Sequence, residues 1–177
     1  MTQELSVSFE DEIKYKNNLK QCCDDEWILW CHLPHDTNWT LESYIKIAEI
    51  KTVGDIIYML EKTKEMTLHS MLFFMKKGIT PMWEDPSNKT GGSFSYKLDF
   101  SNVLVFWEQL AYMILGNTLF EDENYMKNVN GFTISPKKNF YIIKVWMKNS
   151  EYNDTSKIIG MNDCKNHGCI FKKHIEE

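Results

Sequence analysis

The sequence contains no arginine, and all 20 of its basic residues are lysines. Any phosphate that the chain binds would therefore meet lysine ammonium groups and not the bidentate guanidinium fork. The chain also lacks an excess of positive charge, since its formal net charge is −5. This balance argues against non-specific binding to nucleic acid, so any contact with a polyanion should be local and chemically selective.

Long apolar segments are absent as well. No apolar run approaches the roughly 18 residues that a membrane span needs, and the acidic start Met1–Glu12 is unlike a signal peptide. These features predict a cytoplasmic protein that does not contact membranes. The length of 177 residues predicts one domain, which we expect to be monomeric. We assign residues 1–24 to an N-terminal tail with at most one short helix, and residues 25–177 to the domain.

The sequence has few residue patterns that are typical of metal sites or of catalysis. The five cysteines are odd in number and lack framework spacing, which favours reduced thiols. The stretch with Cys164, His167, Cys169 and His174 does not have the spacing of a zinc module. The histidines are scattered and no nucleophile lies beside a base. We therefore predict a protein without a metal or other cofactor, and not an enzyme.

Hydrophobic patterning predicts a mixed α and β chain with hairpins. A capping box at Thr52–Asp55 opens a helix that runs to about Lys64, and Ser101 is expected to cap a second helix over Asn102–Leu115, which Gly116 ends. A third short helix is expected over Asp154–Met161. The expected strands are Glu26–Cys31, Tyr44–Ile50, Thr67–Met75, Gly92–Phe100, Gly131–Ser135, Phe140–Met147 and Gly168–Ile175. This order favours an α+β fold, with a largely antiparallel sheet and helices on one face.

The loop Pro81–Gly92 places Trp83 directly before Glu84, on a segment that prolines and glycines keep out of helix and central strand. An indole can stack on a planar heterocycle while the carboxylate accepts two parallel hydrogen bonds from the ring edge. Guanine offers N1–H and N2–H₂ side by side, so it is a natural ligand for such a pair. The alternative is a half-buried loop anchor next to a solvated acid. For Trp39, which lies between polar residues, a loop anchor and a ligand-facing role are equally open.

The stretch from Gly131 to Asn149 contains four lysines and no acidic residue, in a chain that is acidic as a whole. Its two strands are joined by Pro136–Asn139, which predicts a hairpin with a basic tip. Such a tip can be solvated, or it can meet an anion.

Several motifs together resemble the mRNA cap-binding proteins of the translation initiation factor 4E family. The resemblance spans roughly residues 25–175, and its most specific block is Pro-Met-Trp-Glu-Asp at 81–85 followed by Asn88-Lys89-x-Gly91-Gly92. The other matching positions are Trp27, Trp30, Trp39, Gly78, Phe106, Trp107, Gly116, Gly131, Trp146 and Gly160. The family fold implied is a curved antiparallel sheet, with about three helices on its convex face and the cap pocket on its concave face.

The resemblance also implies roles for individual residues. Trp39 and Trp83 would sandwich the 7-methylguanine ring, Glu84 would accept its N1 and N2 hydrogens, and Trp146 would lie beside the 7-methyl group. Methylation at N7 makes the base cationic, which adds a cation–π contribution to stacking. Lys137 falls on an arginine position that binds phosphate in the family, and Lys138 would contribute through a small register change.

Lysines of the family are missing at Asn139 and Ile142, and Lys144 or Lys148 could replace them if they point inward. On the convex face the resemblance implies a surface for a scaffold peptide around Val53. There Ile57 replaces a tryptophan, and Glu108 and Tyr112 stand where leucines are common. We therefore expect an initiation-factor-4G-type scaffold as partner, or a divergent substitute, which would be virally encoded if the chain is viral.

The function implied is recruitment of capped mRNA to translation initiation. Two alternatives stay open: a cap-binding repressor or competitor without a conventional scaffold partner, and an interaction module that has lost cap binding. An arginine-free, divergent member fits a large DNA virus or an AT-rich protist. A viral protein of this kind would act in host cytoplasm.

Overall fold

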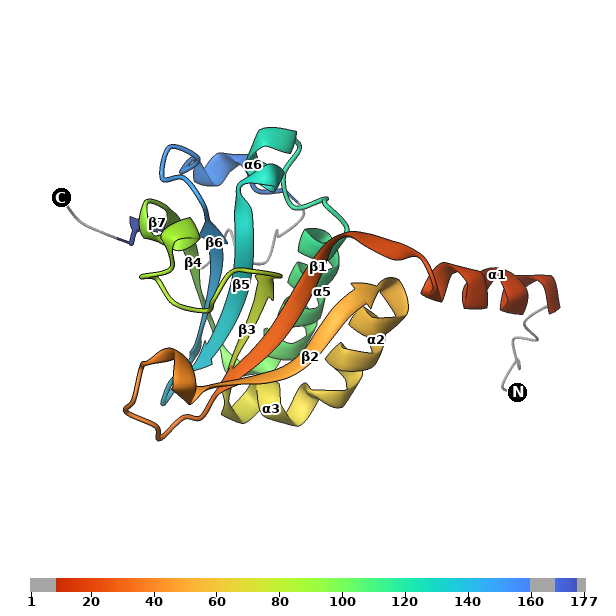
Figure 1. The fold of residues 1–177 in the computed structure, drawn as a ribbon, viewed down its shortest axis with the longest axis horizontal. Coiled ribbons are helices and arrows are strands. Elements are labelled where there is room, and N and C mark those ends of the chain that lie inside the picture. Colours follow the sequence, from red (N-terminus) through yellow and green to blue (C-terminus); the bar gives the residue numbers. More distant parts are fainter. Residues whose placement is uncertain (1–8, 160–167, 175–177) are drawn as a thin grey trace.

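The computed structural model describes residues 9–159 and 168–174, with side chains from residue 14 onward. Its centre is one sheet with the strand order β2-β1-β3-β5-β6-β4-β7, and every pair of neighbours is antiparallel (Figure 1). The strands are β1 (Cys22–His32), β2 (Tyr44–Thr52), β3 (Met71–Lys76), β4 (Gly92–Leu98), β5 (Val129–Pro136), β6 (Tyr141–Met147) and β7 (Cys169–Lys173). The α+β class and the antiparallel sheet are confirmed.

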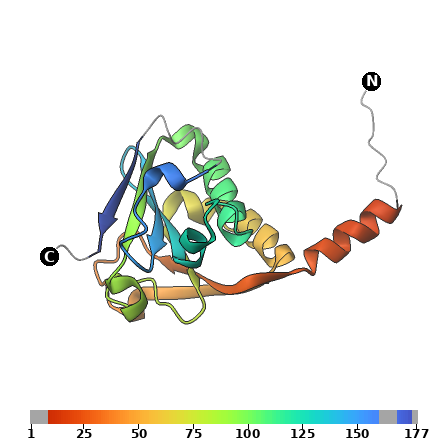
Figure 2. The same cartoon turned by 90° about the horizontal axis from the view of Figure 1, so that it is seen from above.

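Three helices cover one face of this curved sheet, which we call the convex face, and the opposite face is the concave face (Figure 2). They are α2 (Val53–Lys62), α3 (Lys64–His69) and α5 (Val103–Leu115). The remaining helices in the described residues are α1 (Phe9–Leu19), which extends away from the sheet, α4 (Pro86–Lys89), α6 (Glu123–Lys127) and the 3-10 turns Leu41–Ser43, Phe100–Asn102 and Thr155–Lys157.

Most of the core lies between the sheet and these three helices. Strand residues such as Leu29, Phe74 and Phe132 pack there against Trp107 and Leu110 of α5. A second, smaller cluster lies on the concave face, where Phe73, Met75 and Trp146 are buried together. Because successive side chains of a strand point to opposite faces, β3 supplies both clusters: Leu72 and Phe74 belong to the first, Phe73 and Met75 to the second.

Helix boundaries follow local chemistry at α2. The Thr52 hydroxyl accepts a hydrogen bond from the Asp55 amide at 3.2 Å, and the Asp55 carboxylate accepts one from the Thr52 amide at 2.9 Å. This is the capping box that the sequence predicts, and it satisfies two amides that the helix leaves without partners.

Two local predictions are wrong. The strand predicted over Thr67–Met75 begins only at Met71, because Lys64–His69 form α3, whose Met66 and Leu68 pack on the core. Ser101 does not cap α5: the chain enters this helix from a 3-10 turn, and Asn102 is the N-cap residue without a side-chain hydrogen bond. The end of α5 at Gly116 is confirmed.

The ends of the chain differ from expectation in detail. Residues 9–19 form the single N-terminal helix, but β1 already begins at Cys22, so the predicted boundary at 24/25 falls inside a strand. Of the helix predicted over Asp154–Met161, the structure has a 3-10 turn at Thr155–Lys157, and residues from Gly160 onward lie outside the described part. The division into tail and domain stays a prediction.

Candidate functional site

The middle of the concave face has a floor of small residues. In the register across β7, β4, β6 and β5, Lys172 pairs with Ser93, Ser93 with Trp146, and Trp146 with Gly131. One step along, Ile170, Ser95, Lys144 and Thr133 form the next row. Directly paired residues point to the same face. On the concave face, the large side chains of the lysines and of Trp146 are therefore separated by the small residues serine, threonine and glycine. The small residues leave space between the large side chains.

Gly131 is required by this floor. A Cβ atom there would lie 2.5 Å from the carbonyl oxygen of Phe74 and 2.4 Å from Sδ of Met75. At Gly91 a Cβ atom would lie only 1.8 Å from the carbonyl oxygen of Met147. The close approach of β3 to Gly131 and of Met147 in β6 to Gly91 explains these two glycines, and neither has a positive φ.

Trp39 lies on the loop after β1, and 51% of its surface is exposed. One face of its indole is covered by the His32 imidazole, with ring centroids 4.1 Å apart and the planes 1° from parallel. The Tyr44 ring packs edge-on against both. The other indole face is therefore the one that can receive a ligand.

Trp83 lies on the loop before α4 and is 49% exposed, and Glu84 beside it is exposed as well. This loop is fixed from below by Asn88, which is fully buried and donates hydrogen bonds to the carbonyl oxygens of Thr80 (3.1 Å) and Met82 (2.8 Å). Asn130 of β5 donates to the Asn88 side-chain oxygen at 3.0 Å. The loop is thus tied to the sheet, while its two tip residues remain free for contacts.

Asp85 adds a second attachment. Its carboxylate accepts hydrogen bonds from the amide (2.8 Å) and the hydroxyl (2.6 Å) of Thr80, and from the Ser87 amide (2.8 Å). Burial acts to raise the pKa of Asp85, but these hydrogen bonds outweigh it, and the net pKa lies below its ordinary value.

The two tryptophan loops meet at one cavity of about 330 Å³, which we call the tryptophan pocket. Trp39 and Trp83 line its rim, and Trp146, only 7% exposed, lines it from β6. Burial first, and then the charge of Glu84, raises the pKa of Tyr44, another lining residue, to about 12. The other lining residues are Met71, Phe73, Pro81, Ser93, Lys144, Lys172, Lys173 and His174.

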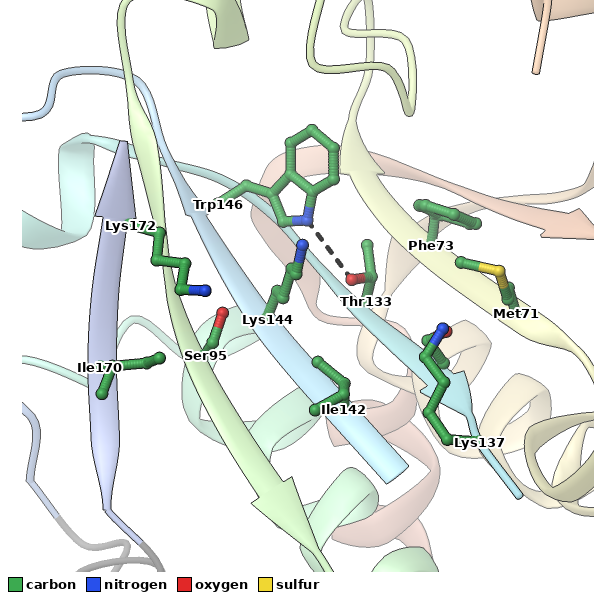
Figure 3. A pocket seen from close by; sticks show the side chains of 11 residues that line it. Met71, Phe73, Ser95, Thr133, Lys137, Ile142, Lys144, Trp146, Ile170 and Lys172 are labelled. Atoms are coloured by element: carbon green, nitrogen blue, oxygen red, sulfur yellow. Dashed lines mark hydrogen bonds between the residues drawn. The ribbon is translucent and has the colours of Figure 1, made fainter. Parts of the chain in front are cut away.

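A second cavity of about 350 Å³ continues along the concave face, and we call it the lysine pocket (Figure 3). Lys137 after β5, Lys144 of β6 and Lys172 of β7 line it, and among the described residues no acidic side chain does. The Lys144 side chain is accessible to solvent, but it lies inside the groove, where surrounding protein atoms reduce its hydration. Its pKa is lowered by this burial and then by the charges of Lys137 and Lys172. The pocket therefore concentrates positive charge in an acidic protein, which suits an anionic ligand.

The two pockets share Met71, Phe73, Lys144, Trp146 and Lys172, so they form one continuous groove. Lys138 is exposed at the hairpin tip and lines neither pocket. Lys148 lines neither pocket either.

Sequence reasoning missed several residues of this groove. Lys172 and Lys173 of β7 and His32 under Trp39 were given no role, because only the pairing of β7 with β4 and of β1 with β2 brings them to the concave face. The sequence feature that could have pointed to Lys172 and Lys173 was the predicted last strand, Gly168–Ile175, which contains them. His174 also lines the groove. Its Nδ1 lies 2.7 Å from the Asn88 carbonyl oxygen, and its ring packs on Trp146.

On the convex side, Val53 and Tyr112 line a cavity of about 240 Å³ together with Gln21, Cys22 and Cys23. Glu108 does not line it but accepts a hydrogen bond from the Tyr112 hydroxyl at 3.0 Å. Ile57 is half-buried on α2, whereas its neighbour Ile56 lines the cavity. The structure thus brings two of the four predicted partner residues to one cavity and links a third to it.

Among residues 9–159 and 168–174, His, Cys, Asp and Glu side chains form no group of three or more that could hold a metal ion. Cys164 and His167 of the metal arrangement that we considered lie outside the described residues. In the same part of the chain, no helix is both long enough and apolar enough to cross a bilayer.

Comparison with known proteins identifies the family. A family model described as eukaryotic initiation factor 4E matches residues 23–174. The chain belongs to this family.

Among its relatives, eukaryotic translation initiation factor 4E-2 of Schizosaccharomyces pombe is 30% identical over 157 residues, which cover 85% of this chain and 63% of that protein. The initiation factor 4E homolog of Acanthamoeba polyphaga mimivirus is 29% identical, over 69% of this chain and 57% of the relative. The chain thus spans about 60% of the length of these two relatives.

Solved structures share the fold of the family. Caenorhabditis elegans eIF4E-3, solved with the 4E-binding protein Mextli and a cap analog, gives a TM-score of 0.73 at 21% identity, covering 88% of this chain and 93% of that one. Ascaris suum eIF4E-3 with m7G cap gives 0.66 at 20% identity, over 74% and 75% of the two chains. The curved antiparallel sheet with helices on its convex face is therefore the family's fold.

Proposed function

We propose that the chain binds the 7-methylguanosine cap of mRNA in the tryptophan pocket and recruits capped mRNA for translation initiation. The observation that carries this proposal is the pair of half-exposed indoles of Trp39 and Trp83, which line one cavity from two different loops. The similarity to the Ascaris suum protein, which was solved with an m7G cap, supports the same ligand.

The physical reason is the charge of the methylated base. Stacking on an aromatic side chain contributes about 1–3 kcal/mol per base, and a cation over an indole adds up to about 2 kcal/mol when it is desolvated. Trp146 at the pocket wall would lie beside the methyl group. An unmethylated guanine would gain the stacking but lose the cationic part.

Glu84 is proposed to read the guanine edge, accepting hydrogen bonds from N1–H and N2–H₂. Its charge already reaches the pocket, since it contributes to the raised pKa of Tyr44. Bonds from a cationic ring to a carboxylate are charge-assisted and contribute about 1.5–3 kcal/mol each.

For the phosphates we propose Lys144 and Lys172 together with Lys137, because these three line the lysine pocket directly beside the tryptophan pocket. Lys138, the other residue inferred from the family pattern, would act only from the exposed hairpin tip. Binding, without catalysis, is the proposed activity, and the cytoplasm the proposed location.

For the convex face we propose a helical partner that docks over Val53 and Tyr112, either of the initiation-factor-4G type or a divergent substitute. The C. elegans structural neighbour was solved with a 4E-binding protein, which supports a partner surface in this fold. The mimivirus relative supports the hypothesis of a viral source, in which case both chain and partner would act in host cytoplasm.

A second candidate function is a cap-binding repressor or competitor. It is favoured by the convex face, where the Glu108 carboxylate and the Tyr112 hydroxyl bond to each other in place of an apolar surface. A chain that binds the cap but no scaffold would withhold mRNA from translation.

The deciding experiment is a titration of intrinsic tryptophan fluorescence with 7-methyl-GTP and, in parallel, with GTP. Stacking should quench the emission at micromolar or lower concentrations of the methylated nucleotide, about −8 kcal/mol or better, and not with GTP. Trp83→Ala should lower the affinity about 10- to 100-fold. Glu84→Gln should keep stacking and lose the preference for guanine. Absence of quenching with both nucleotides would overturn cap binding.

A further inference from the structure

The last described strand, β7, ends beside two walls of the tryptophan pocket. The residue that follows it, His174, lines this pocket and is partly buried. Its backbone N–H donates a hydrogen bond to the Gly91 carbonyl oxygen at 3.1 Å, which continues the pairing of β7 with β4 by one contact. His174 is thereby held next to the segment that carries Trp83, residues 81–91, which we call the Trp83 loop.

The imidazole of His174 makes two further contacts, one with each wall. Its Nδ1 lies 2.7 Å from the Asn88 carbonyl oxygen. Because a carbonyl oxygen can only accept a hydrogen bond, Nδ1 carries the hydrogen and donates it. The ring also packs on the Trp146 indole, with the centroids 4.9 Å apart and the planes inclined by 56°. One side chain therefore contacts both the Trp83 loop and β6.

The contact with Asn88 leads directly to Trp83. The Asn88 side chain donates hydrogen bonds to the carbonyl oxygens of Thr80 and Met82, and Met82 is the residue before Trp83. Asn88 is fully buried, so it has little room to move independently of these partners. A displacement of the Asn88 backbone would therefore be passed on to Trp83.

The contact with Trp146 supports an indole that is otherwise weakly held by hydrogen bonding. Nε1 of Trp146 donates to the Thr133 hydroxyl at 3.4 Å (Figure 3). This distance exceeds the usual range of N–H···O bonds, so the bond restrains the ring only weakly. Inclined aromatic pairs are favourable beyond the area that they bury. The His174 ring therefore helps to fix the orientation of Trp146.

The charge of His174 suits a place beside a cationic base. Burial lowers the pKa of His174, the hydrogen bond to Asn88 acts in the opposite direction, and the charge of Lys144 lowers the pKa further. The net pKa lies below the ordinary value of about 6.5, so the imidazole is neutral at pH 7. It adds no positive charge next to the pocket in which we place the 7-methylguanine.

We propose that His174 is a positioning residue for cap recognition, which couples Trp146 to the Trp83 loop. The inference rests on the proposed function, because that function assigns the 7-methyl group to Trp146 and base stacking to Trp83. The His174 ring acts through Trp146 on the preference for the methylated base. The Nδ1–H acts through Asn88 on the affinity for any guanine nucleotide, since both methylated and unmethylated bases stack on Trp83.

Two substitutions in the full chain separate these roles. His174→Phe keeps a ring against Trp146 and loses the donor, so the affinities for 7-methyl-GTP and for GTP should both fall about two- to tenfold while their ratio stays the same. His174→Asn keeps an N–H donor for the Asn88 carbonyl and loses the ring, so the ratio of the two affinities should fall about two- to tenfold. Fluorescence titration measures both, with GTP taken to millimolar concentrations.

His69→Asn is the matched control, because the His69 side chain is 76% exposed on α3, on the convex face. It should change neither affinity. The ratio is measured within one variant, so a partly unfolded fraction lowers both apparent affinities and leaves the ratio unchanged.

An unchanged ratio in His174→Asn, or an unchanged affinity in His174→Phe, would overturn the proposed coupling. Equal losses for both nucleotides in both variants would show a merely structural residue and would overturn it as well. In each of these cases the unaltered chain still binds 7-methyl-GTP. A failure of the unaltered chain to bind 7-methyl-GTP would instead overturn the proposed function itself.

Discussion

The imidazole of His32 lies flat against the indole of Trp39, with the ring centroids 4.1 Å apart. His32 is fully buried, and its Nε2 lies 2.8 Å from the carbonyl oxygen of Asn38, the residue before Trp39. A loop tryptophan, which would otherwise sample several rotamers, is therefore held by a strand residue with one face covered and one face open. Pre-organisation of this kind lowers the entropy that a ligand has to offset.

Removing the ring beneath Trp39 should weaken cap binding. His32→Leu loses the flat support, and we expect the affinity for 7-methyl-GTP to fall about three- to tenfold. His32→Phe keeps an aromatic ring in place and should restore most of the affinity, although it lacks the hydrogen bond to Asn38. Fluorescence titration of both variants checks this, and equal losses in the two would show that stacking is not what matters.

Lys144 should lower the stability of the fold and strengthen ligand binding. Burial, and then the charges of Lys137 and Lys172, lowers its pKa, so the fold disfavours the protonated lysine. This cost is present at pH values below the lowered pKa and disappears as the pH rises towards the ordinary range of lysine. At pH 7 Lys144→Met should therefore raise the melting temperature by roughly 1–2 °C, while the affinity for 7-methyl-GTP falls.

The control for this change is Lys20→Met, because Lys20 is exposed at the end of α1 and far from the groove in the fold. It should alter neither quantity. A lower melting temperature for Lys144→Met would contradict the expected relief of charge.

Asp85 should stabilise the tryptophan loop in a pH-dependent way. Asp85→Asn cannot accept all three hydrogen bonds from Thr80 and Ser87, and we expect a loss of about 1–2 kcal/mol at pH 7. The folded-state pKa of Asp85 is lowered, so the contribution is fully present above the unfolded pKa of about 4 and disappears as the pH falls through the folded value.

Thermal denaturation of the two chains at neutral and at acidic pH measures this. The difference in melting temperature should be roughly 2–8 °C at pH 7 and should shrink below about pH 4. Asp99→Asn is the matched control, since Asp99 precedes a 3-10 turn without any side-chain capping bond. A difference that is constant with pH would mean that the charge of Asp85 plays no part.

The convex face should bind a consensus scaffold peptide weakly. Ile57 stands where the family resemblance implies a tryptophan, so the largest apolar contact is missing. We expect a Kd above about 10 µM for the unaltered chain and a gain of about tenfold in Ile57→Trp. Tyr58→Trp, on the exposed neighbouring position of α2, should give no gain. A Kd of about 1 µM or lower for the unaltered chain in calorimetry would contradict a diverged face.

The chain sequence by itself determined the features that depend on local chemistry. The capping box at Thr52–Asp55, the end of α5 at Gly116 and the two strands of the 131–147 hairpin follow from neighbouring residues alone. The Trp83–Glu84 pair on its Pro- and Gly-bounded loop was equally readable. Where local signals compete, they failed: Thr67–Met75 has the apolar character of a strand, yet packing on the core keeps its first residues in α3.

Only the tertiary structure decided which distant residues share the groove. Lys172 and Ile170 reach the lysine pocket because β7 pairs with β4, and Lys144 because β6 pairs on the other side of β4. His32 lies under Trp39 because the loop after β1 folds back onto its own strand. Sequence patterns fix which face of a strand a side chain occupies, but they do not fix the order of strands, since that depends on packing between segments far apart in the chain.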